Sequence, residues 1–219
     1  MEHILEWREY KKTKSNYYTK RIPISKIQLE DICDKLNLHN KNIKFLSSGK
    51  YGNAYKIDDK VLKITSDKTE ANSISNLISS NISNKSIVKY YSINRYKLGS
   101  EWVYIILMDY LTPIMDYINN SNYYDFTTTI CNIIYDNWDE MSISEFNEYI
   151  EEIYSIDKLP KLAKDIISKF WKLYNDLKYL KKCPDLHYNN LGIDKNGNIV
   201  LFDFTDFKRI NKFDKPDII

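Results

Sequence analysis

The sequence is poor in residues that interrupt secondary structure, form disulfides or bind metal ions. Its 219 residues include 5 glycines, 5 prolines, 3 cysteines and 3 histidines. Cys33, Cys131 and Cys183 form no Cys-x-x-Cys pair, and His3 and His39 lie in no ligand-like spacing. The pattern excludes a disulfide framework and a zinc site, and it is typical of a reducing compartment.

Strong net charge and long apolar runs are also lacking. The formal net charge is only +2, so bulk electrostatics favour neither nucleic acid nor membrane as a partner. The basic run between Lys11 and Arg21 is either a solvated face or, as an alternative, an RNA-binding module. The apolar run Trp102–Met108 is too short to span a bilayer, and Met1–Tyr10 is no signal peptide. We therefore expect a cytoplasmic protein.

What the sequence does contain suits a folded protein. Hydrophobic residues make up 43% and charged residues 28% of the chain, enough for one domain or two small lobes. Residues 1–42 predict a helical N-terminal extension. In it Ser25 can cap a helix whose apolar positions Ile27, Ile32 and Leu36 recur at helical spacing.

Residues 43–109 predict a small five-stranded lobe with one helix. Asp67 opens that helix, with Ala71, Ile74 and Leu77 on one face. Turns are expected at the two glycines of 49–52 and at 58–59. The expected strands are 43–47, 53–57, 60–65, 87–93 and 102–109.

Residues 110–219 predict a mostly helical second lobe. Ser142 to Glu145 is a capping box, and Pro160 suits the first turn of a long helix that runs to about Lys181. A hairpin closes the lobe, with strands at 191–194 and 199–203 and an Asn196-Gly197 turn. The fold class is therefore α+β, with two lobes.

Three polar residues near the end could carry chemistry together. Asn190 lies five residues after Asp185, and Asp203 follows thirteen residues later, where the hairpin returns the chain. Oxygen ligands such as Asn190 and Asp203 suit Mg²⁺, and Asp185 beside them could orient a hydroxyl or accept its proton. The alternative is an Asx-rich turn with a solvated hairpin.

Here the sequence resembles the protein-kinase superfamily. The likeness lies in the catalytic-loop pattern Asp185-x-x-x-x-Asn190 and the metal-binding Asp203-Phe204 that follows. The tripeptide Asp185-Leu186-His187 is similar to the one in the aminoglycoside-phosphotransferase and choline-kinase branch, and in compact viral kinase-like proteins. The resemblance implies a bilobal kinase-like fold with ATP between the lobes.

The first lobe contains a second part of the resemblance. Ser47, Gly49 and Gly52 follow the glycine-loop spacing, with Ser47 in place of the first glycine. Backbone N–H groups from Gly49 through Lys50 and Tyr51 to Gly52 could cradle phosphates, although a two-glycine hairpin is common by itself.

The third expected strand includes a lysine among apolar neighbours. Val61-Leu62-Lys63-Ile64 is similar to the kinase motif Val-Ala-Ile-Lys, and Lys63 needs an anionic partner there. Glu70 can supply it, or can simply be a first-turn acid favoured by the helix dipole. By the same likeness Met108 is the gatekeeper, and backbone groups of Asp109 and Leu111 would contact adenine.

The sequence also departs from the family. Pro184 replaces the usual Arg before Asp185, and Thr205 replaces the Gly after Asp203-Phe204. Asp206 is either a second metal ligand or a surface acid. The sequence ends soon after it, so we expect other segments or a partner protein to complete the second lobe.

The resemblance implies an ATP- and Mg²⁺-dependent phosphotransferase acting on a hydroxyl, favouring Ser or Thr of a protein, its own chain included. Asp185 and Lys63 would be catalytic, and His187 either contacts the transferred phosphate or supports the loop. The alternatives are a small-molecule kinase of aminoglycoside-phosphotransferase type and a pseudokinase that binds nucleotide or acts as a scaffold.

Overall fold

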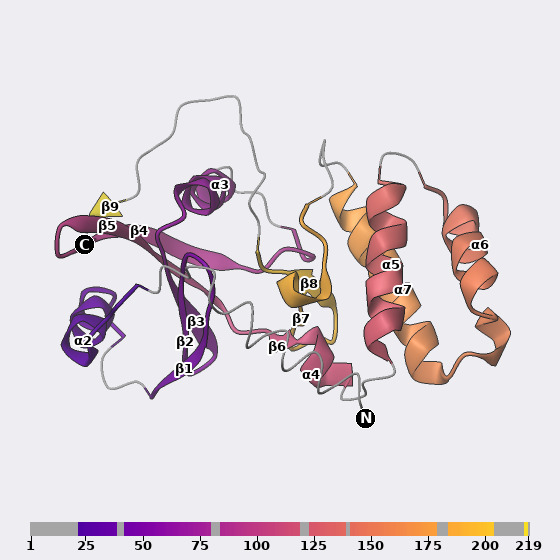
Figure 1. The fold of residues 1–219 in the computed structure, drawn as a ribbon, viewed down its shortest axis with the longest axis horizontal. Helices are drawn as coiled ribbons and strands as arrows, with labels where there is room; N and C mark the ends of the chain where they lie inside the picture. The colour runs from indigo at the N-terminus through magenta and orange to yellow at the C-terminus, as the bar shows by residue number, and fades with distance from the viewer. Residues whose placement is uncertain are drawn as a thin grey trace. The chain divides into compact units, whose positions relative to one another are not determined.

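The structure is a computed structural model that describes residues 22–38, 42–79, 84–118, 123–138, 141–178, 184–203 and 217–218. It confirms the α+β class: the described residues include six α-helices and a sheet of five antiparallel strands to which a sixth, parallel strand is added (Figure 1). The chain divides into two compact units. The first holds the described residues of Met1–Ala71, Tyr90–Met108 and Asp214–Ile219, and the second holds those of Asn72–Lys89 and Asp109–Phe213.

The first unit is built on one sheet. Its strand order is β1-β2-β3-β5-β4-β9. The strands β1 to β3 form a meander in which Lys63 pairs with Ala54, and the tight turn before β3 holds Asp58 at a φ of 55°. The strands are β1 (Ile43–Ser48), β2 (Gly52–Ile57), β3 (Lys60–Thr65), β4 (Tyr90–Leu98), β5 (Glu101–Asp109) and β9 (Asp217–Ile218).

Two features of this sheet differ from the sequence-based expectation. The strand expected at 87–93 is β4, which begins later and runs further, to Leu98. Ile87 instead forms an isolated bridge with Leu201, because the backbone around it bonds to that residue: Val88 N–H donates to the Leu201 carbonyl at 2.9 Å. The short strand β9, parallel to β4, was not expected, since two residues are too few to show a periodicity.

Helix α2 (Lys26–Lys35) covers one face of this sheet. Ser25 caps it through a capping box with Gln28, as expected for the cap. Ile32 is fully buried among sheet residues, but the expectation for Ile27 is wrong, because that side chain is 78% exposed. Cys33, one position beyond Ile32, takes the inward place instead, at 3% exposure.

Two residues, Ser66 and Asp67, separate β3 from helix α3 (Lys68–Ser79). Leu62 and Ile64 pack in the same cluster as α2, whereas Lys63 between them contacts Glu70 of α3. Because alternate strand residues point to opposite faces, α2 and the start of α3 lie on opposite faces of the sheet.

The second unit is mainly helical. Its core lies among α5, α6 and α7, where Phe146 stacks on Trp171 at 5.4 Å between ring centroids. Ser142 forms the expected capping box with Glu145, whereas the long helix ends at Leu177, before the expected Lys181. The helices are α4 (Ile114–Ile118), α5 (Tyr123–Asp136), α6 (Ile143–Ile153) and α7 (Lys161–Leu177), with 3₁₀ turns η1 (Ile156–Lys158) and η2 (Tyr188–Asn190).

A three-stranded sheet completes this unit. It consists of β6 (Thr112–Pro113), β7 (Leu191–Ile193) and β8 (Ile199–Leu201), in that order. The expected hairpin is present, with Gly197 at a φ of 78° in its turn, but β8 ends at Leu201 and not at Asp203. Within the described part of the chain, no helix is both long and apolar enough to cross a membrane.

Candidate functional site

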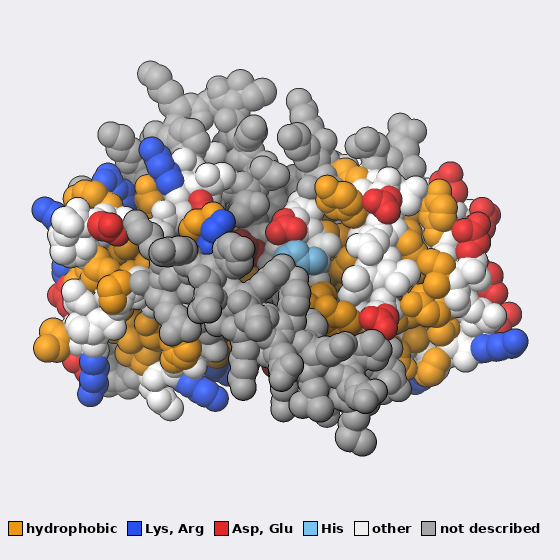
Figure 2. Space-filling view, viewed as in Figure 1, with side chains coloured by type: hydrophobic (Ala, Val, Ile, Leu, Met, Phe, Trp, Pro, Cys, Tyr) orange, Lys and Arg blue, Asp and Glu red, His pale blue; other side chains and the backbone are white. Residues whose placement is uncertain are grey.

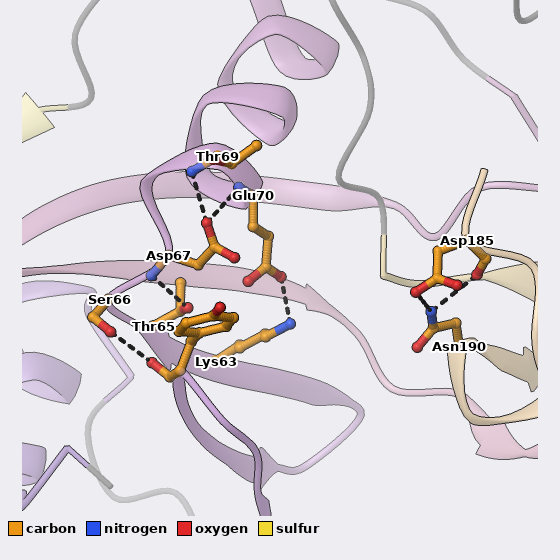
Figure 3. Close-up of polar contacts among 9 residues, drawn as sticks. Lys63, Thr65, Ser66, Asp67, Thr69, Glu70, Asp185 and Asn190 are labelled. Carbon is orange, nitrogen blue, oxygen red and sulfur yellow. Dashed lines mark hydrogen bonds and ion pairs between the residues drawn. The ribbon is translucent and has the colours of Figure 1, made fainter. Parts of the chain in front are cut away.

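Lys63 and Glu70 form an ion pair in the first unit (Figure 3). Lys63 lies in β3 between Leu62 and Ile64, whose side chains are both fully buried. Glu70 lies in the first turn of α3 and is 4% exposed. The seven-residue gap between the pair suffices because only Ser66 and a capping residue separate the strand from the helix.

Asp67 fixes the helix turn that carries Glu70. Its Oδ1 accepts hydrogen bonds from the backbone N–H of Thr69 at 2.7 Å and of Glu70 at 3.2 Å (Figure 3). Its own N–H donates to Oγ1 of the buried Thr65 at 3.1 Å. This is N-cap geometry, so the backbone places the Glu70 carboxylate opposite Lys63.

The glycine turn between β1 and β2 is closed and anchored. Gly49 N–H donates to the Gly52 carbonyl at 2.8 Å, and both the N–H and the hydroxyl of Ser66 donate to the Tyr51 carbonyl, at 2.8 and 3.2 Å. A Cβ on Gly52 would lie 2.0 Å from the Ile64 carbonyl oxygen, whereas one on Gly49 would meet no atom within 4 Å. Gly52 is therefore required by the packing of β2 on β3.

Two consecutive backbone donors of this turn stay unused within the described chain. The N–H groups of Lys50 and Tyr51 have no acceptor among the described residues. The Lys50 ammonium lies 4.9 Å from the centre of the Tyr51 ring. Hydrogen bonding and charge interaction with Tyr51 raise the pKa of Lys50, and the charge of Asp67 adds to the effect. Two adjacent amides beside a cation are a suitable site for an anion.

Asp185 and Asn190 form a second polar cluster, in the second unit (Figure 3). The Asn190 side-chain nitrogen donates to the Asp185 carbonyl at 2.9 Å and to its Oδ2 at 3.2 Å. Asn190 is 7% exposed, but the Asp185 side chain is 64% exposed. A buried amide thus holds a carboxylate that stays open to solvent.

His187 lies between them in the loop. Its Nδ1 accepts a hydrogen bond from the Asn189 backbone N–H at 3.2 Å, which makes it the cap of η2. Its Nε2 lies 3.6 Å from Oδ2 of Asp185. Figure 2 shows a histidine, in pale blue, at the surface of the molecule, in agreement with the 43% exposure of the His187 side chain.

Tyr124, from the first turn of α5, anchors the same loop. Its hydroxyl donates to that of Tyr188 at 2.8 Å, and the ring centroids are 4.7 Å apart. The hydrogen bond with Tyr188, together with burial, raises the pKa of Tyr124 to about 12. The sequence carries no signal for this contact, because the two residues are 64 positions apart and belong to different elements.

Asp203 returns to the loop as the hairpin expectation requires. Phe202 N–H donates to the Asn190 carbonyl at 3.0 Å, so the backbone that leads into Asp203 passes next to Asn190. Because Asn190 turns its nitrogen toward Asp185, its oxygen Oδ1 is the atom left for a cation. One amide oxygen and one carboxylate fit Mg²⁺, which keeps several waters and takes further oxygens from phosphates. Thr205 and Asp206 lie outside the described residues.

The three residues expected to contact adenine differ from one another in burial and in hydrogen bonding. Met108 is 6% exposed in β5. Asp109 uses its backbone N–H for the Lys89 carbonyl at 3.0 Å, so that amide is not available to a base. Leu111 is half-buried against Gly192, where a Cβ would lie 2.6 Å from the Leu111 Cβ.

The expected site residues therefore fall into two clusters, one in each unit. Lys63, Glu70 and the glycine turn belong to the first, and Asp185, Asn190 and Asp203 to the second. Ser66, Asp67 and Tyr124 support these clusters and were not expected as site residues, although an Asp that opens a helix is itself a capping signal. No model of a known protein family matches the sequence. No curated protein matches it either.

Proposed function

We propose that this protein is an ATP- and Mg²⁺-dependent phosphotransferase with a bilobal, protein-kinase-like fold. It moves the γ-phosphate of ATP to a hydroxyl, with Ser or Thr of a protein, its own chain included, as the favoured acceptor. The observation that carries the proposal is the loop in which buried Asn190 holds exposed Asp185 while Phe202 returns the chain beside it.

Asp185 would act on the acceptor. An exposed carboxylate whose Oδ2 is engaged by Asn190 can accept a proton through its other oxygen. In the transfer, the acceptor O–H gives its proton to Asp185 as its oxygen bonds to the γ-phosphorus. The bond from that phosphorus to the bridging oxygen breaks, and its electron pair leaves with ADP.

Lys63 would neutralise phosphate charge. Its ammonium is already fixed by Glu70, which supports a point charge at a constant place. The amides of Lys50 and Tyr51, which have no acceptor among the described residues, and the Lys50 ammonium provide a second contact for an anionic chain of phosphates.

Asn190 and Asp203 would hold the metal. Bound Mg²⁺ supplies positive charge that offsets the charge developing on the phosphates. The role of the protein is to present Oδ1 of Asn190 and the carboxylate of Asp203 on a loop held by hydrogen bonds. Catalysis in this class consists mostly of positioning and charge neutralisation.

The test is transfer of labelled γ-phosphate from ATP with Mg²⁺, using the protein itself, a generic protein mixture and aminoglycosides as acceptors. Wild type is compared with Asp203→Asn and with Asp194→Asn, a matched change in the same hairpin that lies outside the proposed site and keeps an acceptor in the turn. We expect transfer by wild type and Asp194→Asn, and loss of transfer in Asp203→Asn.

Thermal unfolding with ATP and Mg²⁺ separates the alternatives. Stabilisation by nucleotide without transfer to any acceptor would favour the pseudokinase. Labelling of aminoglycosides in place of protein would favour the small-molecule kinase. If ATP with Mg²⁺ neither stabilises the protein nor supports transfer, a nucleotide-dependent function is refuted.

A further inference from the structure

We propose that His187 is a positioning residue that orients the Asp185 carboxylate, so that Oδ1 of Asp185 is the oxygen that meets the acceptor hydroxyl. The inference rests on the phosphotransferase function proposed above. It assigns a different role to His187 from contact with the transferred phosphate.

The hydrogen bond to the His187 ring determines which of its nitrogens carries the proton. Nδ1 of His187 accepts a hydrogen bond from the Asn189 backbone N–H at 3.2 Å. A neutral imidazole has one donor nitrogen and one acceptor nitrogen. Because Nδ1 is the acceptor, the proton lies on Nε2, and the backbone of the loop selects this tautomer.

The two oxygens of the Asp185 carboxylate have different surroundings. The protonated Nε2 lies 3.6 Å from Oδ2 of Asp185, and the Asn190 amide nitrogen lies 3.2 Å from the same oxygen. Oδ2 therefore accepts one hydrogen bond, from Asn190, and has the His187 Nε2 just beyond hydrogen-bond distance, while Oδ1 makes no hydrogen bond to any described residue. Contacts of catalytic groups are often long before substrate binds and shorten in the complex.

A contact between His187 and a phosphate would need a donor on the imidazole ring. Both ring nitrogens of His187 face partners inside its own loop, one at Asn189 and the other at Asp185. A neutral imidazole has a single donor, and here that donor, Nε2, lies 3.6 Å from Oδ2 of Asp185. His187 is thus placed to support Asp185, and the carboxylate it supports is 64% exposed and open to an acceptor.

Two substitutions of His187 test the roles of its two ring nitrogens separately. His187→Asn keeps an acceptor near the place of Nδ1 and so keeps the cap of η2, but it does not reach Asp185. His187→Gln keeps a donor near the place of Nε2 but loses the cap. We expect kcat to fall about 10-fold or more in His187→Asn, with the KM for ATP within about 2-fold of wild type.

The Gln variant gives the opposite pattern. We expect it to unfold at a lower temperature than His187→Asn and yet to keep a higher kcat. If His187 had a purely structural role, the less stable variant would also be the less active one. A less stable His187→Gln with the higher kcat is therefore specific to a positioning role. Tyr124→Phe, which loosens the same loop without touching Asp185, is the control for a general loss of loop order.

Two results would overturn the inference. One is a kcat for His187→Asn equal to or above that of His187→Gln. The other is a KM for ATP that rises 10-fold in both variants at constant kcat, which would make His187 a phosphate contact.

A readout without turnover keeps this inference separate from the proposed function. The ¹⁵N chemical shift of His187 Nε2 should change on Asp185→Asn, while the Asn189 amide signal stays in place. The protein has 3 histidines, so comparison with His187→Asn assigns the signal. If wild type transfers no phosphate, the proposed function fails; an Nε2 shift insensitive to Asp185 would refute the positioning contact itself.

Discussion

The side-chain nitrogen of Asn190 donates to both the carbonyl and the carboxylate of Asp185, at 2.9 and 3.2 Å. The donor is buried, at 7% exposure, and the carboxylate it holds is largely open to solvent. A buried amide that satisfies two acceptors of a loop stabilises one loop conformation, because leaving those groups unpaired is costly. The same amide therefore determines both the shape of the loop and the direction of its exposed carboxylate.

Replacing Asn190 with Ala should reduce both stability and transfer. We expect a loss of about 1–3 kcal/mol in the free energy of unfolding, because two hydrogen bonds to Asp185 disappear. Phosphate transfer should fall about 100-fold or more as Asp185 loses its orientation. Urea unfolding and the labelled-ATP assay measure the two effects.

Asn189→Ala is the matched control for that change. Asn189 is exposed and contributes its backbone N–H, which alanine retains. Its free energy of unfolding should stay within about 0.5 kcal/mol of wild type. Equal effects of the two substitutions would contradict the role assigned to the Asn190 amide.

The two glycines of the β1–β2 turn should respond differently to alanine. A Cβ on Gly52 would collide with the Ile64 carbonyl, so Gly52→Ala should cost about 3 kcal/mol or more in the free energy of unfolding. Gly49 meets no atom within 4 Å and has no positive φ, so Gly49→Ala should change it by less than about 0.5 kcal/mol. Thermal and urea unfolding test the pair; a tolerant Gly52 would contradict the close approach of β2 to β3.

Local patterns were sufficient for much of the fold. The strand Lys60–Thr65 and the caps Ser25 and Ser142 follow from turn and capping residues next to them in the sequence, and the structure confirms all three. Ile87 shows where such patterns fail. Its apolar neighbourhood suggests a strand, but hydrogen bonds to Leu201, more than a hundred residues away, determine its place.

In the candidate site too, contacts between residues close in sequence could be predicted and long-range contacts could not. Lys63 and Glu70 are close in sequence, and their positions on a strand and on the following helix were sufficient to predict that they pair. The structure has this ion pair. The support of the loop by Tyr124 could not, because it depends on how α5 packs beside η2. The contact of His187 with Asp185 also depends on backbone geometry, since the Asn189 N–H sets the orientation of the ring.

The Lys63–Glu70 pair should show strong coupling in a double-mutant cycle. Lys63→Met and Glu70→Gln each leave a poorly solvated partner, and we expect each to cost about 2–3 kcal/mol in the free energy of unfolding. This is less than the 3–5 kcal/mol typical of fully buried pairs, because the Lys63 side chain is 22% exposed. The double variant should lose at least about 1 kcal/mol less than the sum of the single losses.

The exposed pair Lys26 and Glu30 is the control for this cycle. Its members lie four residues apart in α2, and their side chains are 88% and 53% exposed. Pairs of this kind contribute about 0.3–0.5 kcal/mol, so their coupling should be small. Additive losses at Lys63 and Glu70, measured by urea unfolding, would show that the ion pair contributes no more than this control.

Asp194 should make the stability of the β7–β8 hairpin depend on pH. Burial acts to raise the pKa of its carboxyl, but hydrogen bonds from Asn198 and Asn196 outweigh it and lower the pKa below the usual 3.8. A group whose pKa is lower in the folded state contributes stability above its unfolded pKa, and this is lost as the pH falls through the folded pKa. Asp194→Asn keeps an acceptor but does not titrate, so wild type should exceed it in free energy of unfolding by about 1 kcal/mol at pH 6. Urea unfolding should show this difference shrinking toward pH 3, and a difference that is constant with pH would mean that the charge of Asp194 does not support the turn.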